Sequence, residues 1–120
     1  MTNKFCVSLT YAKNDADKAT VAFVVANAAV ASDKDTVVFL STEAVRLCQQ
    51  GYADDVHEEA FAPLKDLMAN FVKAGGKIWV CSPCFKRRKL DEQQLIAGAT
   101  IVGGAKLVEF LSDGSPCVSY

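Results

Sequence analysis

Three features are missing from this 120-residue chain, and each absence narrows what the protein can be. The longest nearly apolar stretch, residues 19–31, contains Asn27 and falls short of the roughly 18 residues that a membrane span requires, so we expect no membrane partner. The first residues lack the charged-then-apolar pattern of a secretory signal, which predicts a cytoplasmic location. No linker rich in proline, glycine or serine divides the chain, so we expect a single domain over residues 1–120.

An excess of charge of either sign is also missing. Thirteen basic and fourteen acidic side chains leave a formal net charge of −1, which argues against direct binding of nucleic acid. Hydrophobic residues make up 51% of the chain, which argues against disorder. Five cysteines are an odd number, and in a reducing compartment such thiols are more often free, metal-binding or redox-active than part of a disulfide framework.

Short runs rich in β-branched and aromatic residues alternate with longer helical patterns, as in a parallel sheet with crossover helices. The expected strands cover residues 5–9, 35–40, 77–80, 99–102 and 116–120. The expected helices cover residues 16–31, 42–48, 61–74, 91–98 and 105–111, with an exposed acidic loop over residues 52–60. The helix over residues 16–31 is apolar nearly all round, which predicts that the sheet covers one side of it and that another element covers the other side, for which a second subunit is a candidate.

The most informative motif is the Cys-Ser-Pro-Cys sequence at residues 81–84, which directly follows the expected strand at residues 77–80. Ser82 is a good helix N-cap and Pro83 suits the first helical position. Cys81 would then lie just outside the helix, where the unpaired amides lower the pKa of its thiol. Cys84 is close enough in sequence to form a disulfide or to resolve a sulfur adduct. The spacing therefore assigns the attacking or carrying role to Cys81 and the resolving role to Cys84.

Other interpretations of the cysteines stay open. The pair could be two buried small hydrophobic residues. A structural zinc site commonly takes four ligands, and no second cysteine pair has a suitable spacing, so we expect no metal and no cofactor. We expect His57 to lie in a solvated acidic loop, and the isolated cysteines to be packing residues: Cys6, Cys48 and Cys117.

A basic run follows the cysteine pair. Lys86, Arg87 and Arg88 could attract an anionic substrate or partner and help to hold Cys81 as thiolate. They could equally form a solvated face that complements the C-terminal end of a short helix. The sequence does not choose between these two roles.

Taken together, these residues resemble the DsrE/DsrF-like family, which includes YchN-like proteins and the D subunit of the tRNA 2-thiouridine sulfur relay. The resemblance covers nearly the whole chain. It rests on the loop at Asn14 before a long apolar helix, on the strand at residues 37–40, and on a strand that ends in Cys81 and is followed by Arg87 and Arg88. Residues 97–104 resemble the closing strand and turn of the family.

The resemblance implies a three-layer α/β/α sandwich with a mostly parallel sheet of about five strands, assembled as a homo-oligomer, either a trimer or a hexamer. It implies that Cys81 accepts sulfur as a persulfide and passes it on, and that Cys84 corresponds to the second cysteine of YchN-like members. Two positions depart from the family pattern. Residues 41–45 stand where relay members often have an Asp-Gly-Val turn, and Lys89 replaces a glycine that commonly follows the paired arginines.

The leading functional hypothesis is therefore a cytoplasmic, sulfurtransferase-like sulfur carrier with a sulfur-donor protein and a sulfur-acceptor protein as partners. Candidate residues for binding the substrate or partner are Asn14, Lys86, Arg87 and Arg88. The first alternative is a thioredoxin-like dithiol-disulfide oxidoreductase that uses Cys81 and Cys84. The second is a non-catalytic assembly subunit that uses the fold as an interaction surface.

Overall fold

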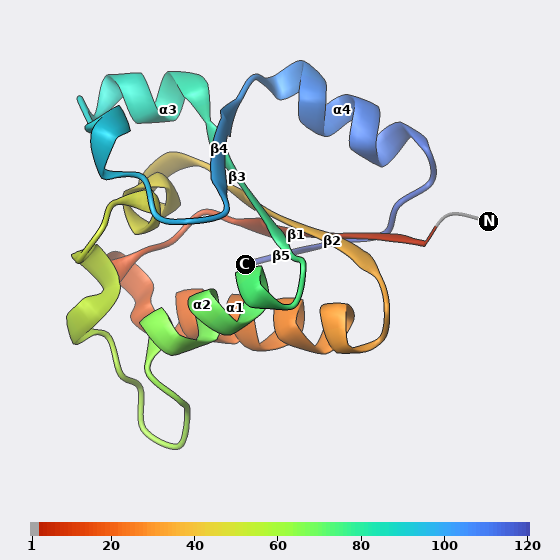
Figure 1. Ribbon diagram of the computed structural model, residues 1–120. Helices are drawn as coiled ribbons and strands as arrows, with labels where there is room; N and C mark the ends of the chain where they lie inside the picture. Colours follow the sequence, from red (N-terminus) through yellow and green to blue (C-terminus); the bar gives the residue numbers. More distant parts are fainter. Residues whose placement is uncertain (1–2) are drawn as a thin grey trace.

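The computed structural model describes residues 3–120 and places a five-stranded sheet between helices (Figure 1). Every strand pair in the sheet is parallel, and the spatial order is β4-β3-β2-β1-β5. The predicted α/β fold with a sheet of about five strands is confirmed. The strands are β1 (Lys4–Leu9), β2 (Asp35–Leu40), β3 (Lys77–Cys81), β4 (Ala99–Val102) and β5 (Cys117–Ser119).

The helices follow the predicted order with some changes of length. The α-helices are α1 (Ala16–Ala31), α2 (Leu64–Lys73), α3 (Ser82–Arg87) and α4 (Gly104–Ser112). The 3₁₀ helices are η1 (Lys13–Asp15), η2 (Thr42–Cys48), η3 (Tyr52–Asp55) and η4 (Glu92–Gln94). The helix expected over residues 91–98 is only η4, and the loop expected to be exposed over residues 52–60 begins with η3 and buries Ala53 and Val56.

The layers follow from the order of the strands. From β1 to β4 the chain moves across the sheet in one direction, so right-handed crossovers place α1 and α2 on the same face. The last strand, β5, lies beyond β1, so the chain must return, and α4 crosses the opposite face (Figure 1). Phe110 of α4 packs edge-to-face on Trp79 of β3 with ring centroids 5.4 Å apart. These contacts complete the α/β/α sandwich.

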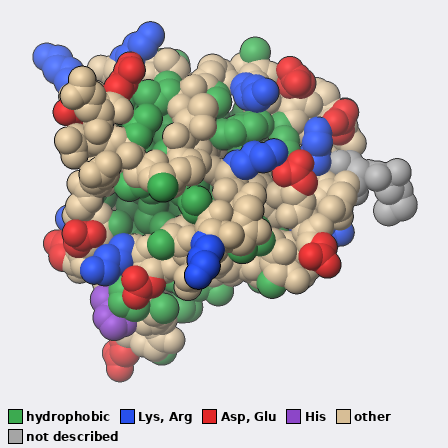
Figure 2. Space-filling view, viewed as in Figure 1, with side chains coloured by type: hydrophobic (Ala, Val, Ile, Leu, Met, Phe, Trp, Pro, Cys, Tyr) green, Lys and Arg blue, Asp and Glu red, His purple; other side chains and the backbone are tan. Residues whose placement is uncertain are grey.

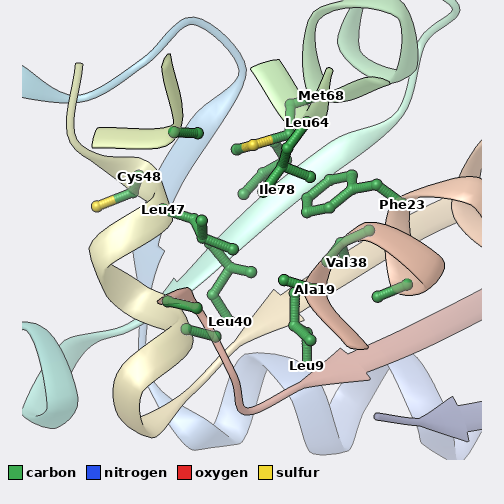
Figure 3. Packing of buried hydrophobic residues seen from close by; sticks show 14 of the residues in the cluster. Leu9, Ala19, Phe23, Val38, Leu40, Leu47, Cys48, Leu64, Met68 and Ile78 are labelled. Carbon is green, nitrogen blue, oxygen red and sulfur yellow. The ribbon is translucent and has the colours of Figure 1, made fainter. Parts of the chain in front are cut away.

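The larger core lies between the sheet and the layer formed by α1 and α2. The small side chains of α1 allow close packing, and Phe23 meets Phe71 of α2 edge-to-face at 5.9 Å. Figure 3 shows side chains from both helices, three strands and η2 converging in this layer. The labelled members are Leu9, Ala19, Phe23, Val38, Leu40, Leu47, Cys48, Leu64, Met68 and Ile78.

Packing against α2 explains part of the apolar character of α1. Asn27, the polar residue in its middle, donates hydrogen bonds from Nδ2 to the carbonyl of Phe23 at 2.8 Å and to the carbonyl of Leu67 at 2.9 Å, which ties α1 to α2. Helix α2 thus covers part of the side of α1 that the sheet leaves open, whereas Val21 and Val24 are half-buried and Ala28 is exposed. The expectation that a second subunit covers the rest of α1 therefore stays a prediction. None of the helices in residues 3–120 is both long and apolar enough to span a membrane.

Candidate functional site

The candidate site lies at the carboxyl edge of the sheet, where parallel strands deliver the loops that most often carry function. Strand β1 leads into η1, which contains Asn14, β2 leads into η2, and β3 leads into α3. Cys81 is the last residue of β3 and pairs with Val102 of β4. Its half-buried side chain packs against the hydrophobic clusters on both faces of the sheet.

The junction between β3 and α3 differs by one residue from the prediction. Cys81 itself is the N-cap of α3, with φ −61° and ψ 116°, and Ser82 is the first helical residue. The strand continues through Cys81 because its register with β4 extends to Val102, so no linking residue remains before the helix. The assignment of Ser82 as N-cap and Pro83 as first helical residue was wrong, although Pro83 still lies in the first turn, where its missing N–H is not needed.

The structure brings the two motif cysteines together. Cys84 lies one turn into α3, is half-buried like Cys81, and is also a free thiol. The Cys84 thiol interacts with that of Cys81 and contributes to its titration. A pair of reduced thiols in mutual contact at a strand end can exchange a sulfur adduct or close to a disulfide.

Burial raises the pKa of the Cys81 thiol, and the adjacent Cys84 thiol raises it further. The backbone amide of Cys84 and the positive charge of Arg88 act in the opposite direction but do not outweigh burial. The prediction of a lowered pKa was therefore wrong for the isolated chain. Helix α3 has six residues, and its end does not offset the loss of solvent around the sulfur. Cys81 must lose a proton before it can act as a nucleophile.

Arg88 is the basic residue that joins the site. Its Nε donates to Oε1 of Glu43 at 3.0 Å, and its Nη1 donates to the carbonyl of Cys84 at 3.3 Å. Glu43 also accepts from Nε of Arg46, at 2.9 Å and 3.0 Å to its two carboxylate oxygens. Arg88 first and then Arg46 hold the pKa of the Glu43 carboxyl below its usual value. Arg88 therefore fixes α3 against η2, whereas Lys86 and Arg87 are exposed.

The two departures from the family pattern coincide with two residues in the left-handed region. Lys89 has φ +52° directly after the C-cap of α3, where glycine is favoured. Thr42 has φ +51° at the start of η2, and its hydroxyl donates to the carbonyl of Thr10 at 2.9 Å. Both residues adopt a backbone conformation that glycine adopts more easily, at a cost in local strain.

Asn14 has a local structural role. Its Oδ1 accepts a hydrogen bond from the backbone N–H of Ala12 at 2.8 Å, which shapes the turn before α1. His57 likewise pairs within its own loop, through Nε2 and the carbonyl of Phe61 at 2.8 Å. Within residues 3–120, no cluster of three or more side chains of the metal-ligating types is close enough to hold a metal ion.

Comparison with protein families shows to which family the chain belongs. The model of the DsrE/DsrF-like family matches residues 3–119.

The chain belongs to the DsrE/DsrF-like family.

This family is associated with sulfur relay, and its match confirms the resemblance seen in the sequence. Among curated relatives, the uncharacterized protein MJ0989 of Methanocaldococcus jannaschii is 26% identical over 98% of this chain and 99% of its own length. The uncharacterized protein MJ0760 of the same organism is 30% identical over 86% of this chain, and the matched part is 38% of MJ0760. The chain thus spans well under half the length of that relative.

Solved structures show the same fold. The ychN protein from E. coli superposes with a TM-score of 0.83 over 100% of both chains at 16% sequence identity. Protein MTH1491 from Methanobacterium thermoautotrophicum superposes with a TM-score of 0.69 over 98% of both chains at 13% identity. At these identities the likeness extends to the family fold and not to its chemistry.

The remaining cysteines of this DsrE/DsrF-like chain divide into two kinds. Cys6 and Cys48 are fully buried, which confirms their prediction as packing residues. Cys117 is exposed on the edge strand β5, so the same prediction was wrong for it.

An apolar cavity of about 300 Å³ lies apart from the cysteine pair. It is bounded by α2, by the segment from η2 to η3, and by Ile96 and Ala97, and neither Cys81 nor Cys84 lines it. Figure 2 shows hydrophobic side chains gathered mainly in the left half of this face, with charged side chains around them and across the right half. The cavity adds no chemical group to the candidate site.

Proposed function

We propose that the protein carries sulfane sulfur as a persulfide on Cys81 and passes it to an acceptor protein, with Cys84 as the resolving thiol. The observation that supports this most directly is the pair of free, half-buried thiols in mutual contact at the end of β3. Membership of a family associated with sulfur relay supports the same assignment. The proposal thus gives catalytic roles to both cysteines: Cys81 carries the sulfur and Cys84 resolves the adduct.

The loading step balances without any cofactor. The Cys81 thiol loses its proton, and the thiolate attacks the outer sulfur of a donor persulfide. The sulfur–sulfur bond of the donor breaks, the donor leaves as a thiolate that takes up a proton, and Cys81 retains the outer sulfur as a persulfide. Half-burial limits the access of other thiols to this adduct.

Release has two routes that differ in the role of Cys84. An acceptor thiolate can attack the outer sulfur, which returns Cys81 to a thiol. Alternatively, the Cys84 thiolate attacks the inner sulfur, forms a disulfide with Cys81 and expels hydrosulfide. The second route leaves an oxidised pair that an external thiol must reduce before another cycle.

Arg88 is the basic residue best placed to support this chemistry. Its charge favours the Cys81 thiolate, and its hydrogen bond to the carbonyl of Cys84 at 3.3 Å holds the resolving residue. Glu43 is occupied by Arg88 and Arg46 and stays ionised, which suits an anchor for Arg88. Lys86 and Arg87 are exposed and are proposed, with Asn14, as contacts for an anionic partner surface.

The test is the sulfur content of the intact protein after incubation with a persulfide donor. We expect the parent to gain the mass of one sulfur atom and Cys81→Ser to gain none. Cys117→Ser is the matched control, because Cys117 is the exposed cysteine of the chain and offers the most accessible competing thiol. Equal loading of the parent and Cys81→Ser would remove the basis of the proposal.

The contact between Cys81 and Cys84 also supports a second candidate, a dithiol-disulfide oxidoreductase. Such an enzyme needs both thiols for each turnover, whereas a carrier needs only Cys81 for loading. Disulfide-reduction turnover by the parent that disappears in Cys84→Ser, with sulfur loading also lost, would favour the oxidoreductase. Intact loading in Cys84→Ser would favour the carrier.

The raised pKa of Cys81 is the observation that favours a third candidate, a non-catalytic assembly subunit. That role predicts slow alkylation of Cys81 at neutral pH even when partner proteins are present. A carrier predicts that a donor protein accelerates the alkylation. The two outcomes separate these functions.

The wider setting is also proposed: a single domain in the cytoplasm that assembles with copies of itself as a trimer or hexamer and acts between a donor and an acceptor protein. Light scattering coupled to size-exclusion chromatography tests the assembly. A mass of one chain at micromolar concentration would contradict it.

A further inference from the structure

Cys6 and Cys117 form a second pair of cysteines. They are far from Cys81 and Cys84 in sequence, and they lie near the edge of the sheet opposite β4. They lie directly opposite each other in the parallel register of β1 and β5. Residues at paired positions of parallel strands point to the same face. Cys6 packs with Val37, Phe39, Trp79 and Phe110, so the face shared by both thiols is the one that α4 covers.

The two thiols touch, and they differ in their access to solvent. Cys6 is fully buried and Cys117 is exposed. Burial, together with the contact to Cys117, raises the pKa of Cys6 to about 12. Cys6 therefore stays protonated at neutral pH, and the exposed Cys117 is the member of the pair that an external reagent reaches first.

The backbone already has the spacing that a disulfide needs. Neighbouring strands lie about 4.8 Å apart, within the Cα–Cα range of about 4.4–6.8 Å seen for disulfides. Hydrogen bonds hold the strands in this register on both sides of the pair, from the N–H of Cys6 to the carbonyl of Pro116 at 3.0 Å and from the N–H of Tyr120 to the carbonyl of Ser8 at 2.9 Å. A bond between the sulfurs requires rotation of side chains and little movement of strands.

We propose that Cys117 and Cys6 are a redox modification site that reacts with peroxides and closes to a disulfide. The Cys117 thiolate attacks one peroxide oxygen, the oxygen–oxygen bond breaks, and Cys117 becomes a sulfenic acid while the other oxygen leaves as water or an alcohol. The Cys6 sulfur then attacks the sulfenic sulfur, loses its proton and expels water. The two thiols lose two electrons in total, and the peroxide gains them.

The disulfide fixes the weakest strand of the sheet. Strand β5 has three residues, lies at an edge and is paired only with β1 among residues 3–120. Short terminal edge elements open most easily, so in the reduced protein β5 can separate from β1. A bond between Cys6 and Cys117 prevents this separation, because it closes a covalent loop across almost the whole chain. The site thereby couples the oxidation state of the surroundings to the exposure of the β1 edge.

The experiment uses the full-length double variant Cys81→Ser/Cys84→Ser, which lacks the competing cysteine pair. This protein is treated with hydrogen peroxide, alkylated, and digested with trypsin without reduction. The two cysteines fall in different tryptic peptides, residues 5–13 and 107–120, and Cys48 falls in a third, residues 47–65. We expect the peptides 5–13 and 107–120 to be linked with the loss of two hydrogen atoms, and Cys48 to be alkylated only after denaturation. Cys117→Ser in the same background is the control and should show no link and an unmodified Cys6.

Cys117 recovered as a sulfinic acid, or joined to Cys117 of another molecule, with Cys6 still a free thiol, would overturn the proposal. The structural consequence is measured by hydrogen exchange. In the oxidised protein the amide of Tyr120 should exchange at least about tenfold more slowly than in the reduced protein, because it can no longer be exposed by separation of β5. Equal exchange rates in the linked and reduced proteins would show that the disulfide does not hold the strand.

Discussion

Replacing Arg88 by methionine removes one guanidinium that connects two parts of the site. The parent side chain is 17% exposed and donates to Glu43 at 3.0 Å and to the carbonyl of Cys84 at 3.3 Å. A hydrogen bond between charged groups contributes about 1.5–3 kcal/mol when well shielded, but Glu43 is 31% exposed and keeps Arg46. We therefore expect Arg88→Met to lower the free energy of unfolding by about 1–2 kcal/mol.

The same change affects the reactivity of Cys81. Arg88 lowers the pKa of that thiol, so its loss raises the pKa and reduces the thiolate fraction near neutral pH. The charge of Arg88 affects that pKa less than burial and the Cys84 thiol do, so the alkylation rate near neutral pH should fall while Cys81 remains reactive. Urea unfolding measures the stability, and the rate of iodoacetamide modification of Cys81 as a function of pH measures the reactivity.

Arg87→Met is the matched control, because Arg87 is the same residue type one position away and is exposed. We expect it to change the unfolding free energy by less than about 0.5 kcal/mol and to leave the pH profile of alkylation in place. Equal effects of the two substitutions, or no effect of Arg88→Met on either quantity, would refute the role given to Arg88.

Three further predictions concern stability. A Cβ on Gly76 would lie 2.3 Å from the ring of Phe71, so Gly76→Ala should lower the free energy of unfolding, measured in urea, by about 1–3 kcal/mol. A Cβ on Gly104 would meet no atom within 4 Å, so Gly104→Ala should leave that free energy unchanged or raise it by up to about 1 kcal/mol. Folding lowers the pKa of Glu43, so the stability that its carboxylate contributes is fully present above the usual pKa of 4.5 and is lost as the pH falls through the lowered pKa of the folded state. The loss of stability on acidification should therefore be shallower in Glu43→Gln. Folding raises the pKa of Cys6 from 9.0 to about 12, so the free energy of unfolding should fall as the pH rises through that interval. The fall should be less steep in Cys6→Ala. Identical pH profiles of parent and variant would contradict either of the last two.

The sheet could be predicted from the sequence because its strands are strongly marked. All residues of β2 after Asp35 are buried, and the Val-Val-Phe-Leu run encodes this directly. Residues 91–98 were harder, because a capping pattern at Asp91 suggested a helix that tertiary contacts shorten. The N–H of Gln50 donates to the carbonyl of Gln94 at 2.7 Å, and the N–H of Ile96 donates to the carbonyl of Cys48 at 2.8 Å. These hydrogen bonds hold the residues after η4 in an extended conformation. Local sequence patterns do not reveal them, because they join residues that are more than 40 positions apart.

The candidate site was only partly predictable. The position of Cys81 at a strand end follows from the apolar run before it, and the structure confirms it. The pairing of Glu43 with Arg88 joins residues 45 positions apart, and the one local signal was the i,i+3 spacing of Glu43 and Arg46. The raised pKa of Cys81 depends on burial by neighbours from several elements, which spacing does not reveal.

The exposure of Cys117 could not be read from its apolar neighbours either. It depends on the order of the strands, which places β5 at an edge and next to β1. That same order creates the contact with Cys6, since the two residues are far apart in the chain.

The central claim is that sulfur resides on Cys81, and peptide-level mass spectrometry tests it most directly. The parent is loaded with a persulfide donor, alkylated and digested with trypsin, which places Cys81 and Cys84 in the peptide 78–86 and Cys117 in the peptide 107–120. Fragmentation of the first peptide should locate one alkylated persulfide on Cys81, and the peptide 107–120 should carry a simple alkylated thiol. A persulfide found on Cys84 or Cys117, with Cys81 alkylated as a bare thiol, would contradict the account.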